Sequence, residues 1–360
     1  MSDKTDPLTE ATEKNKVLDA IDGKLVADDL AELPRGHLGM SQIGGDKRTV
    51  WLQYRWSFPK DFTGRTLRIF EMGHVIEEVV LDYLQKIGVE VHGRQPDQIG
   101  YSDFDGHFAG SLDGMGLKIP GAPKTWHVLE VKTSNKSRFA ELQKKGYQKW
   151  SPAYYAQLQL YMLYSQTTRA LVIVYCKDNS ELYVERIHFK KLEALGFVTK
   201  ATEILNDEVL PGSSYPDRTY YEIASYKSDE YQAIYWGDEL PQPNCRNCQF
   251  SQRAENAEWG CNWHTKYLTV EDQVKGCSNH NYLVALLSQK AELVKEGEYE
   301  TTWKFGDIEF VNSEDDGILN FLSEEIVHLY KTEFVALGDE KLLAARKELG
   351  GRITELENLK

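Results

Sequence analysis

The segments GSLDGM (110–115) and LEVK (129–132) are expected to be paired strands that carry charged side chains. Alternate side chains of a strand share a face, so Glu130 and Lys132 are expected to point the same way. A hairpin that pairs the two segments would bring Asp113 beside Glu130. Charged side chains in an otherwise apolar strand are costly unless they are paired or bind a metal. The alternative is a surface hairpin whose charges have no chemical role.

A divalent cation is the expected partner of these groups. Two carboxylates, from Asp113 and Glu130, together with the backbone carbonyl of Val131 form an oxygen-rich site that suits Mg²⁺ or Mn²⁺. A lysine beside such a site, here Lys132, can orient or deprotonate a bound water, or stabilise the charge on a phosphate.

Two helical segments carry further candidates. The segment 65–88 is expected to be a helix that ends at Gly88, and its Glu77 could supply a third carboxylate; the alternative is an ordinary solvated Glu. Gln157 and Tyr161 lie four residues apart on a second helix, so they share a face and could contact the substrate backbone or the lysine. The apolar stripe of helix 65–88 is expected to consist of Ile69, Met72, Ile76, Val79, Val80, Tyr83, Leu84 and Ile87.

The order of periodic segments predicts an α/β fold with a mixed central β-sheet flanked by helices, mixed because hairpins are present. Residues 1–30 are expected to form a frayed arm or a short helix. The tail after 281 is expected to contain a helix, a short hairpin at 302–312, and further helices. The expected strands are 89–95, 106–115, 126–133, 169–178 and 182–189, and the other expected helices are 154–166 and 190–207.

The composition excludes some classes of protein. The chain has 360 residues with 42 basic and 56 acidic side chains, a net charge of −14, which argues against a passive nucleic-acid coat but not against an enzyme with a local basic path. No apolar run approaches the ~18–20 residues that a membrane helix needs. Because residues 1–16 contain no apolar signal segment, a cytoplasmic location is expected.

A basic track follows the Glu–Lys strand. Phe139, Tyr147 and Trp150 interleave with its cations, and aromatic rings can stack on splayed bases while cations neutralise phosphates. This combination favours contact with a DNA backbone over the alternative, a solvated lysine-rich helix. The expected DNA-contacting residues are Lys136, Arg138, Lys144, Lys145 and Lys149.

Four cysteines cluster with the spacing C-x2-C-x12-C-x15-C, and this pattern suits a structural, tetrahedral Zn²⁺. His264 could replace one thiolate, and His280 is a further candidate. The alternative is a set of free buried thiols. The expected zinc ligands are Cys245, Cys248, Cys261 and Cys277.

Taken together and in order, these motifs resemble the PD-(D/E)XK nuclease superfamily, and within it the RecB-like exonucleases of phage type. The resemblance covers residues 35–210 and includes an entry segment at 35–51. The motif residues are Gly73–Glu77, Gly110–Gly114, Glu130–Lys132 and Gln157–Tyr161.

The resemblance implies a restriction-endonuclease-like core and Mg²⁺-dependent hydrolysis of phosphodiester bonds in DNA. It assigns metal binding to Glu77, Asp113 and Glu130, and activation of the water to Lys132. The expected role is that of an exonuclease in phage-type recombination, replication or repair, in the host cytoplasm if phage-encoded. The alternatives are a structure-specific endonuclease of the same superfamily and a non-catalytic protein that binds DNA ends or a partner.

The expected domains are an N-terminal arm (1–34), the nuclease core (35–240), a Cys-rich zinc-binding region (241–285) and a C-terminal α/β appendage (286–360). The appendage could dock a recombinase or a single-strand-binding protein. Some RecB-like relatives hold an iron–sulfur cluster with one cysteine near the entry segment. Because the segment around 44–48 has no cysteine here, zinc is favoured.

Overall fold

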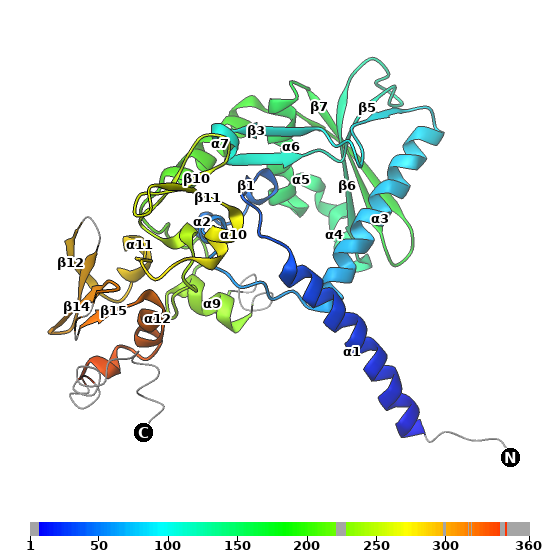
Figure 1. Cartoon of the computed structure of the whole chain (residues 1–360). Coiled ribbons are helices and arrows are strands. Elements are labelled where there is room, and N and C mark those ends of the chain that lie inside the picture. The colour runs from blue at the N-terminus through cyan, green and yellow to red at the C-terminus, as the bar shows by residue number, and fades with distance from the viewer. Residues whose placement is uncertain are drawn as a thin grey trace. The chain divides into compact units, whose positions relative to one another are not determined.

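The computed structural model of this protein describes residues 7–220, 228–297, 300–315, 317, 319–338 and 343. The chain divides into two compact units, and Figure 1 labels the helices and strands along the chain. The first consists of Met1–Pro34, Lys60–Tyr101 and Gly110–Leu195, and the second of Arg35–Pro59, Ser102–Ala109 and Gly196–Lys360. The predicted domain boundaries stay a prediction.

The first unit is built on a five-stranded sheet with the order β2-β5-β6-β7-β8. Strands β6 and β7 are parallel, and every other neighbouring pair is antiparallel. The predicted mixed α/β architecture is therefore confirmed. The strands are β2 (Glu90–His92), β5 (Gly114–Leu117), β6 (His127–Ser134), β7 (Arg169–Cys176) and β8 (Leu182–His188).

Helix α3 covers one face of this sheet through a buried apolar cluster, in which Val80, Leu81 and Leu84 pack with Leu129 and Val131 of β6. Helix α6 contacts β6 and β7. The helices of this unit are α1 (Pro7–Ala31), α3 (Gly64–Lys86), α4 (Lys136–Lys145), α5 (Tyr147–Trp150) and α6 (Pro152–Tyr164), and α7 (Lys191–Asn206) continues into the second unit.

The predicted apolar stripe of α3 is only partly buried. Val80 and Leu84 belong to the core, and Ile76 packs against it. The sheet covers less of the helix than the stripe spans, so the flanking members of the stripe stay outside the core. The exposed members are Ile69, Met72, Val79, Tyr83 and Ile87.

Two further segments differ from expectation. Residues 7–31 form a helix of 25 residues rather than a frayed arm or a short helix, because the segment after Pro7 is rich in Leu, Ala, Glu and Lys, which favour helices. The predicted strand 106–115 is two strands, β4 (Phe108–Ser111) and β5, which Leu112 and Asp113 separate.

The second unit contains two small sheets with the orders β11-β10-β9 and β12-β13-β14-β15, and a parallel pairing of β1 with β4. The predicted tail of a helix, a hairpin and a helix corresponds to α11, β13–β14 and α12; residues 339–342 and 344–360 lie outside the described residues. The longer elements are α2 (Lys47–Tyr54), α9 (Asp229–Trp236), α10 (Val270–Lys275), α11 (Val284–Leu287), α12 (Ser323–Lys331), β12 (Glu292–Glu296), β13 (Thr301–Phe305) and β14 (Ile308–Asn312). The short strands of this unit are β1 (Leu38–Gly39), β9 (Ser251–Arg253), β10 (Trp259–Cys261), β11 (Lys266–Leu268) and β15 (Asn320–Phe321), and β3 (Gly100–Asp103) begins in the first unit and ends in the second.

A buried arginine joins the Cys-rich segment to the start of the second unit. Arg246 is 1% exposed, and its guanidinium lies 4.4 Å from the ring centre of Trp56 and 4.0 Å from that of Trp259. It donates hydrogen bonds to the carbonyl of Gly36 and to the side chain of Gln273. These contacts offset the desolvation of the cation, which lowers the pKa of Arg246 to about 9.

None of the helices that the structure describes has both the length and the apolar character that crossing a bilayer requires.

Leu129→Ala is expected to lower the free energy of unfolding by about 2–4 kcal/mol, because it removes buried methyl groups from the contact between α3 and β6. Urea denaturation measures the change. Leu192→Ala is the control, because that side chain is 85% exposed, and it should change stability by less than about 0.5 kcal/mol. Equal effects of the two substitutions would contradict this assignment of the core.

Candidate active site

Asp113 immediately precedes β5, and Gly114 pairs with Leu129 of β6 in antiparallel register. The next position of β6 is Glu130, so the pairing places Asp113 opposite it. The Asp113 Oδ2 accepts a hydrogen bond of 2.8 Å from the backbone N–H of Val131. The expected juxtaposition of the two acidic residues is present, and β-sheet hydrogen bonding fixes it.

Glu130 and Lys132 share the face of β6 that is turned away from α3, because the alternate residues Leu129 and Val131 pack against that helix. Glu130 is fully buried. Its Oε1 lies 2.5 Å from the Nζ of Lys132, and among the described residues no other donor reaches its two oxygens. A buried carboxylate with one cationic neighbour and unused acceptor positions is typical of a cation-binding site.

The electrostatics show that three acidic groups are close together. Burial raises the pKa of Glu130 to about 7; Lys132 opposes this shift and Asp113 adds to it. Burial and the negative charge of Asp113 raise the pKa of Glu77 to about 8. Burial tends to lower the pKa of Lys132, but Glu130 and Asp113 outweigh it and hold that pKa well above its usual range. The lysine therefore keeps its proton at neutral pH.

The donor chemistry of this set fits Mg²⁺ or Mn²⁺, because the unused oxygens of Glu130 lie among acidic neighbours. Among the described residues, however, no group of three or more His, Cys, Asp or Glu side chains converges closely enough to hold a metal ion as placed. Metal ligation by Glu77, Asp113, Glu130 and the carbonyl of Val131 therefore stays a prediction.

Gln157 and Tyr161 lie on α6, and the Nε2 of Gln157 donates a hydrogen bond of 3.0 Å to the hydroxyl of Tyr161. Burial and the neighbouring Glu130 raise the pKa of Tyr161. The two side chains are only 6% and 2% exposed. They therefore line the buried side of the carboxylate cluster, and their burial does not favour the predicted contact with a substrate backbone.

Two tyrosines near the site were not among the sequence candidates for it. The ring centre of Tyr154 lies 5.2 Å from the Nζ of Lys132. Tyr147 is fully buried, and burial together with Glu130 raises its pKa well above the usual range. Tyr154 precedes Gln157 and Tyr161 by three and seven residues, so helical spacing could have identified it. Tyr147 is on a separate helix, and no sequence signal marks it.

The predicted basic track is helical, and Lys136, Arg138, Lys144, Lys145 and Lys149 are all exposed. Contact of these cations with DNA stays a prediction. The predicted base stacking by the aromatic residues is wrong, because these apolar rings pack into the core. The buried rings are Phe139, Tyr147 and Trp150, which are 2%, 0% and 7% exposed.

The four cysteines of the second unit line one cavity of about 60 Å³ together with His264. Burial and the neighbouring thiols raise the pKa of Cys245 to about 11 and that of Cys248 to about 12. The backbone N–H of His264 donates to the sulfur of Cys261 at 3.4 Å. Thiolates are preferred ligands of a structural Zn²⁺. Among the described residues, however, no three Cys or His side chains are placed closely enough to hold a metal ion, so zinc binding by these cysteines stays a prediction.

His280 lines the same cavity, but both nitrogens of its ring have hydrogen-bond partners. Its Nδ1 lies 2.7 Å from the hydroxyl of Ser323, and its Nε2 lies 2.7 Å from the side-chain oxygen of Asn247. Burial lowers its pKa to about 3, so the ring is neutral. Ligation by His280 would break one of these two hydrogen bonds, so the geometry favours His264 over His280; both alternatives to a cysteine ligand stay predictions.

Similarity to solved structures extends over about half of the chain. The structure of LHK-Exo in complex with dAMP has 18% identity and a TM-score of 0.36, and the match covers 47% of this chain and 86% of that chain. The alkaline exonuclease (LHK-Exo) from Laribacter hongkongensis has 17% identity and a TM-score of 0.36, with 48% and 87% of the two chains covered. No family model matches the sequence. No curated protein matches it either.

Glu77→Gln is expected to stabilise the metal-free protein at alkaline pH. The folded pKa of Glu77, about 8, lies above its ordinary value of 4.5, so folding holds a proton that the unfolded chain loses between those values. The stability of the wild type should therefore fall relative to the variant as pH rises from about 4.5 to about 8, by about 1–3 kcal/mol. Urea denaturation in EDTA at pH 5 and pH 8.5 measures this difference.

The control is Glu71→Gln, an exposed position on the same helix, which should show no such pH-dependent difference. Adding Mn²⁺ at pH 8.5 should stabilise the wild type more than Glu77→Gln. Equal stabilisation of both proteins by Mn²⁺ would remove Glu77 from the ligand set.

Proposed function

We propose that this protein is a Mg²⁺- or Mn²⁺-dependent DNA nuclease, an exonuclease of recombination, replication or repair. The observation that supports this most is the convergence of Asp113, Glu130 and Lys132 on paired strands, with Glu77 close enough to feel their charge. A fully buried carboxylate with free acceptor positions is uncommon in folded proteins, and a bound cation would use those positions.

Each side chain has a part in the proposed reaction. Asp113, Glu130 and Glu77 would hold the cation, which supplies Lewis-acid stabilisation of a phosphodiester and lowers the pKa of a bound water. Asp113 is held in register by the N–H of Val131. The ammonium group of Lys132 is positioned by Glu130 at 2.5 Å, and it orients the attacking water and stabilises the charge that develops on the phosphate.

The exposed cations of α4 and α5 supply a path for the DNA backbone in a protein of net charge −14. Strand β6 leads from Lys132 directly into α4 after Ser134, so these cations follow the reactive lysine in the chain. Binding through them is expected to be local and to weaken as the salt concentration rises.

We also propose that the second unit holds a structural Zn²⁺ through Cys245, Cys248, Cys261 and Cys277. The cavity that these thiols share and the N–H donated to the sulfur of Cys261 support this proposal. Such an ion would stabilise a segment of very short strands.

Asp113→Asn, Glu130→Gln and Lys132→Met are each expected to reduce DNA degradation at least about 100-fold, because each removes a group that stabilises charge in the reaction. The measurement is release of label from end-labelled linear DNA in Mg²⁺ and in EDTA. A closed circular DNA in the same assay should stay intact, because an exonuclease requires an end.

Matched controls are Asp97→Asn and Lys177→Met, which change exposed side chains of the same unit and should retain activity. Wild-type levels of cleavage in Asp113→Asn, or cleavage in EDTA, would refute the metal-dependent mechanism. Cutting of the closed circle would instead identify an endonuclease.

Elemental analysis is expected to find one zinc per chain and no iron, and the protein should lack visible absorption. Cys248→Ser should lower the zinc content and the stability of the second unit, because it removes a buried thiolate ligand. Cys176→Ala is the control, since that buried cysteine lies in β7 of the first unit, and it should keep its zinc. Iron and visible absorption would favour an iron–sulfur cluster instead.

A further inference from the structure

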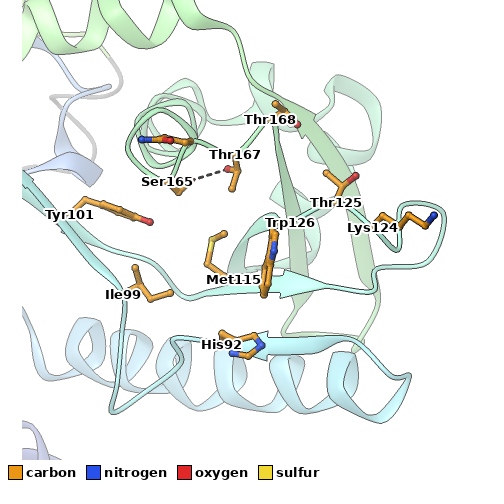
Figure 2. Close-up of a pocket in the computed structure, with 11 residues that line it drawn as sticks. His92, Ile99, Tyr101, Met115, Lys124, Thr125, Trp126, Ser165, Thr167 and Thr168 are labelled. Atoms are coloured by element: carbon orange, nitrogen blue, oxygen red, sulfur yellow. Dashed lines mark hydrogen bonds between the residues drawn. The ribbon is translucent and has the colours of Figure 1, made fainter.

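The first unit contains a pocket of about 550 Å³, whose lining residues Figure 2 shows. One of its lining residues, Met115 of β5, pairs with Val128 of β6. Val128 precedes Glu130 by two residues and therefore shares its face of the sheet, the face opposite α3. Two residues of a strand span about 7 Å, so Val128, the partner of the pocket residue Met115, lies about 7 Å along β6 from Glu130.

Helix α6 runs from the surroundings of Glu130 to the pocket. Tyr161 lies close enough to Glu130 for the carboxylate to raise its pKa. Ser165, the C-terminal cap of this helix, follows Tyr161 by four residues and lines the pocket. One helical turn rises about 5.4 Å. The strand and the helix therefore both place the pocket about one strand or helix repeat from Glu130, within the reach of one nucleotide of a DNA strand. Val128 and Tyr161, which lie between the two places, are buried, so the strand would pass over them and not between them.

Aromatic rings define the pocket. Trp126 immediately precedes β6 and is 40% exposed. Its ring centre lies 5.4 Å from that of His92, at an interplanar angle of 64°. Figure 2 shows the side chains of Tyr101 and Met115 directed into the same space. A planar ligand could stack on the ring of Trp126 and contact the polarisable thioether of Met115.

The polar groups of the pocket favour a ligand without positive charge. None of its 11 lining residues is acidic, although 56 of the 360 residues of the chain are Asp or Glu. Lys124 lies at its rim (Figure 2). The hydroxyls of Ser165 and Thr167 lie 2.9 Å apart and offer hydrogen bonds to a polar ring edge.

The geometry points to a subsite for a nucleobase of the DNA strand whose phosphate lies at Glu130 and Lys132. This inference rests on the proposed nuclease function. The base stacks on Trp126, its edge meets the hydroxyls of Ser165 and Thr167, and Lys124 faces the backbone. Because every base has an aromatic face, the subsite tolerates any sequence and fixes the position of the strand relative to the carboxylates.

Fluorescence quenching tests this subsite in EDTA, where binding is measured without cleavage. The probes are single-stranded oligonucleotides with 2-aminopurine at one of the three terminal positions of either end. In the wild type, one position should be quenched on binding through stacking on Trp126. Trp126→Ala should abolish that quenching and weaken binding about 5- to 100-fold, whereas Trp126→Phe should retain binding.

Tyr83→Ala is the control, because it removes an aromatic ring that is 45% exposed on α3, and it should bind like the wild type. Cleavage assays in Mg²⁺ then separate the two proposals. Cleavage with no Trp126-dependent quenching at any position overturns the subsite alone. Trp126-dependent quenching without cleavage supports the subsite and overturns the nuclease. If the protein shows neither Trp126-dependent quenching nor cleavage, both proposals are overturned.

Discussion

Burial of one carboxylate, that of Glu130, is the constraint around which the first unit is arranged. A fully buried, ionised carboxylate is costly in free energy unless it is paired and hydrogen-bonded. The ammonium group of Lys132 pairs with the Glu130 carboxylate and favours its ionised form, whereas the negative charge of Asp113 disfavours that form. The remaining acceptor positions of Glu130 have no donor among the described residues. In the proposed function they would bind a divalent cation, so the group whose burial is costly without metal would also be the one that holds the ion.

The pairing of β5 with β6 fixes the positions of the side chains around Glu130. The register of Gly114 with Leu129 sets the position of Asp113, and the N–H of Val131 holds its carboxylate. The same register places Met115 beside Val128 and thereby extends the reactive face toward the pocket. A shift of one residue would turn Glu130 toward the apolar surface of α3 and would remove the site and the pocket together.

The second unit depends on a different kind of burial. Arg246 is held between aromatic rings instead of by a carboxylate, and its neighbour Cys245 belongs to the thiol cavity. The strands β9, β10 and β11 have three residues each, which is short for independent stability. A bound zinc and the stacked arginine would together supply the order that such short strands lack.

The candidate acidic residues and the lysine could be predicted from the amino-acid sequence, because strand alternation and the order of the motifs depend only on local spacing. It therefore predicted that Glu130 and Lys132 share a face and that Asp113 lies beside them. Only the tertiary structure decided which side chains are covered. It buried Phe139 and Trp150, used both ring nitrogens of His280 in hydrogen bonds, left five of the eight residues of the α3 stripe exposed, and brought Tyr147 close to the carboxylates. Burial depends on contacts between segments far apart in the chain, and periodicity within one segment carries no information about them.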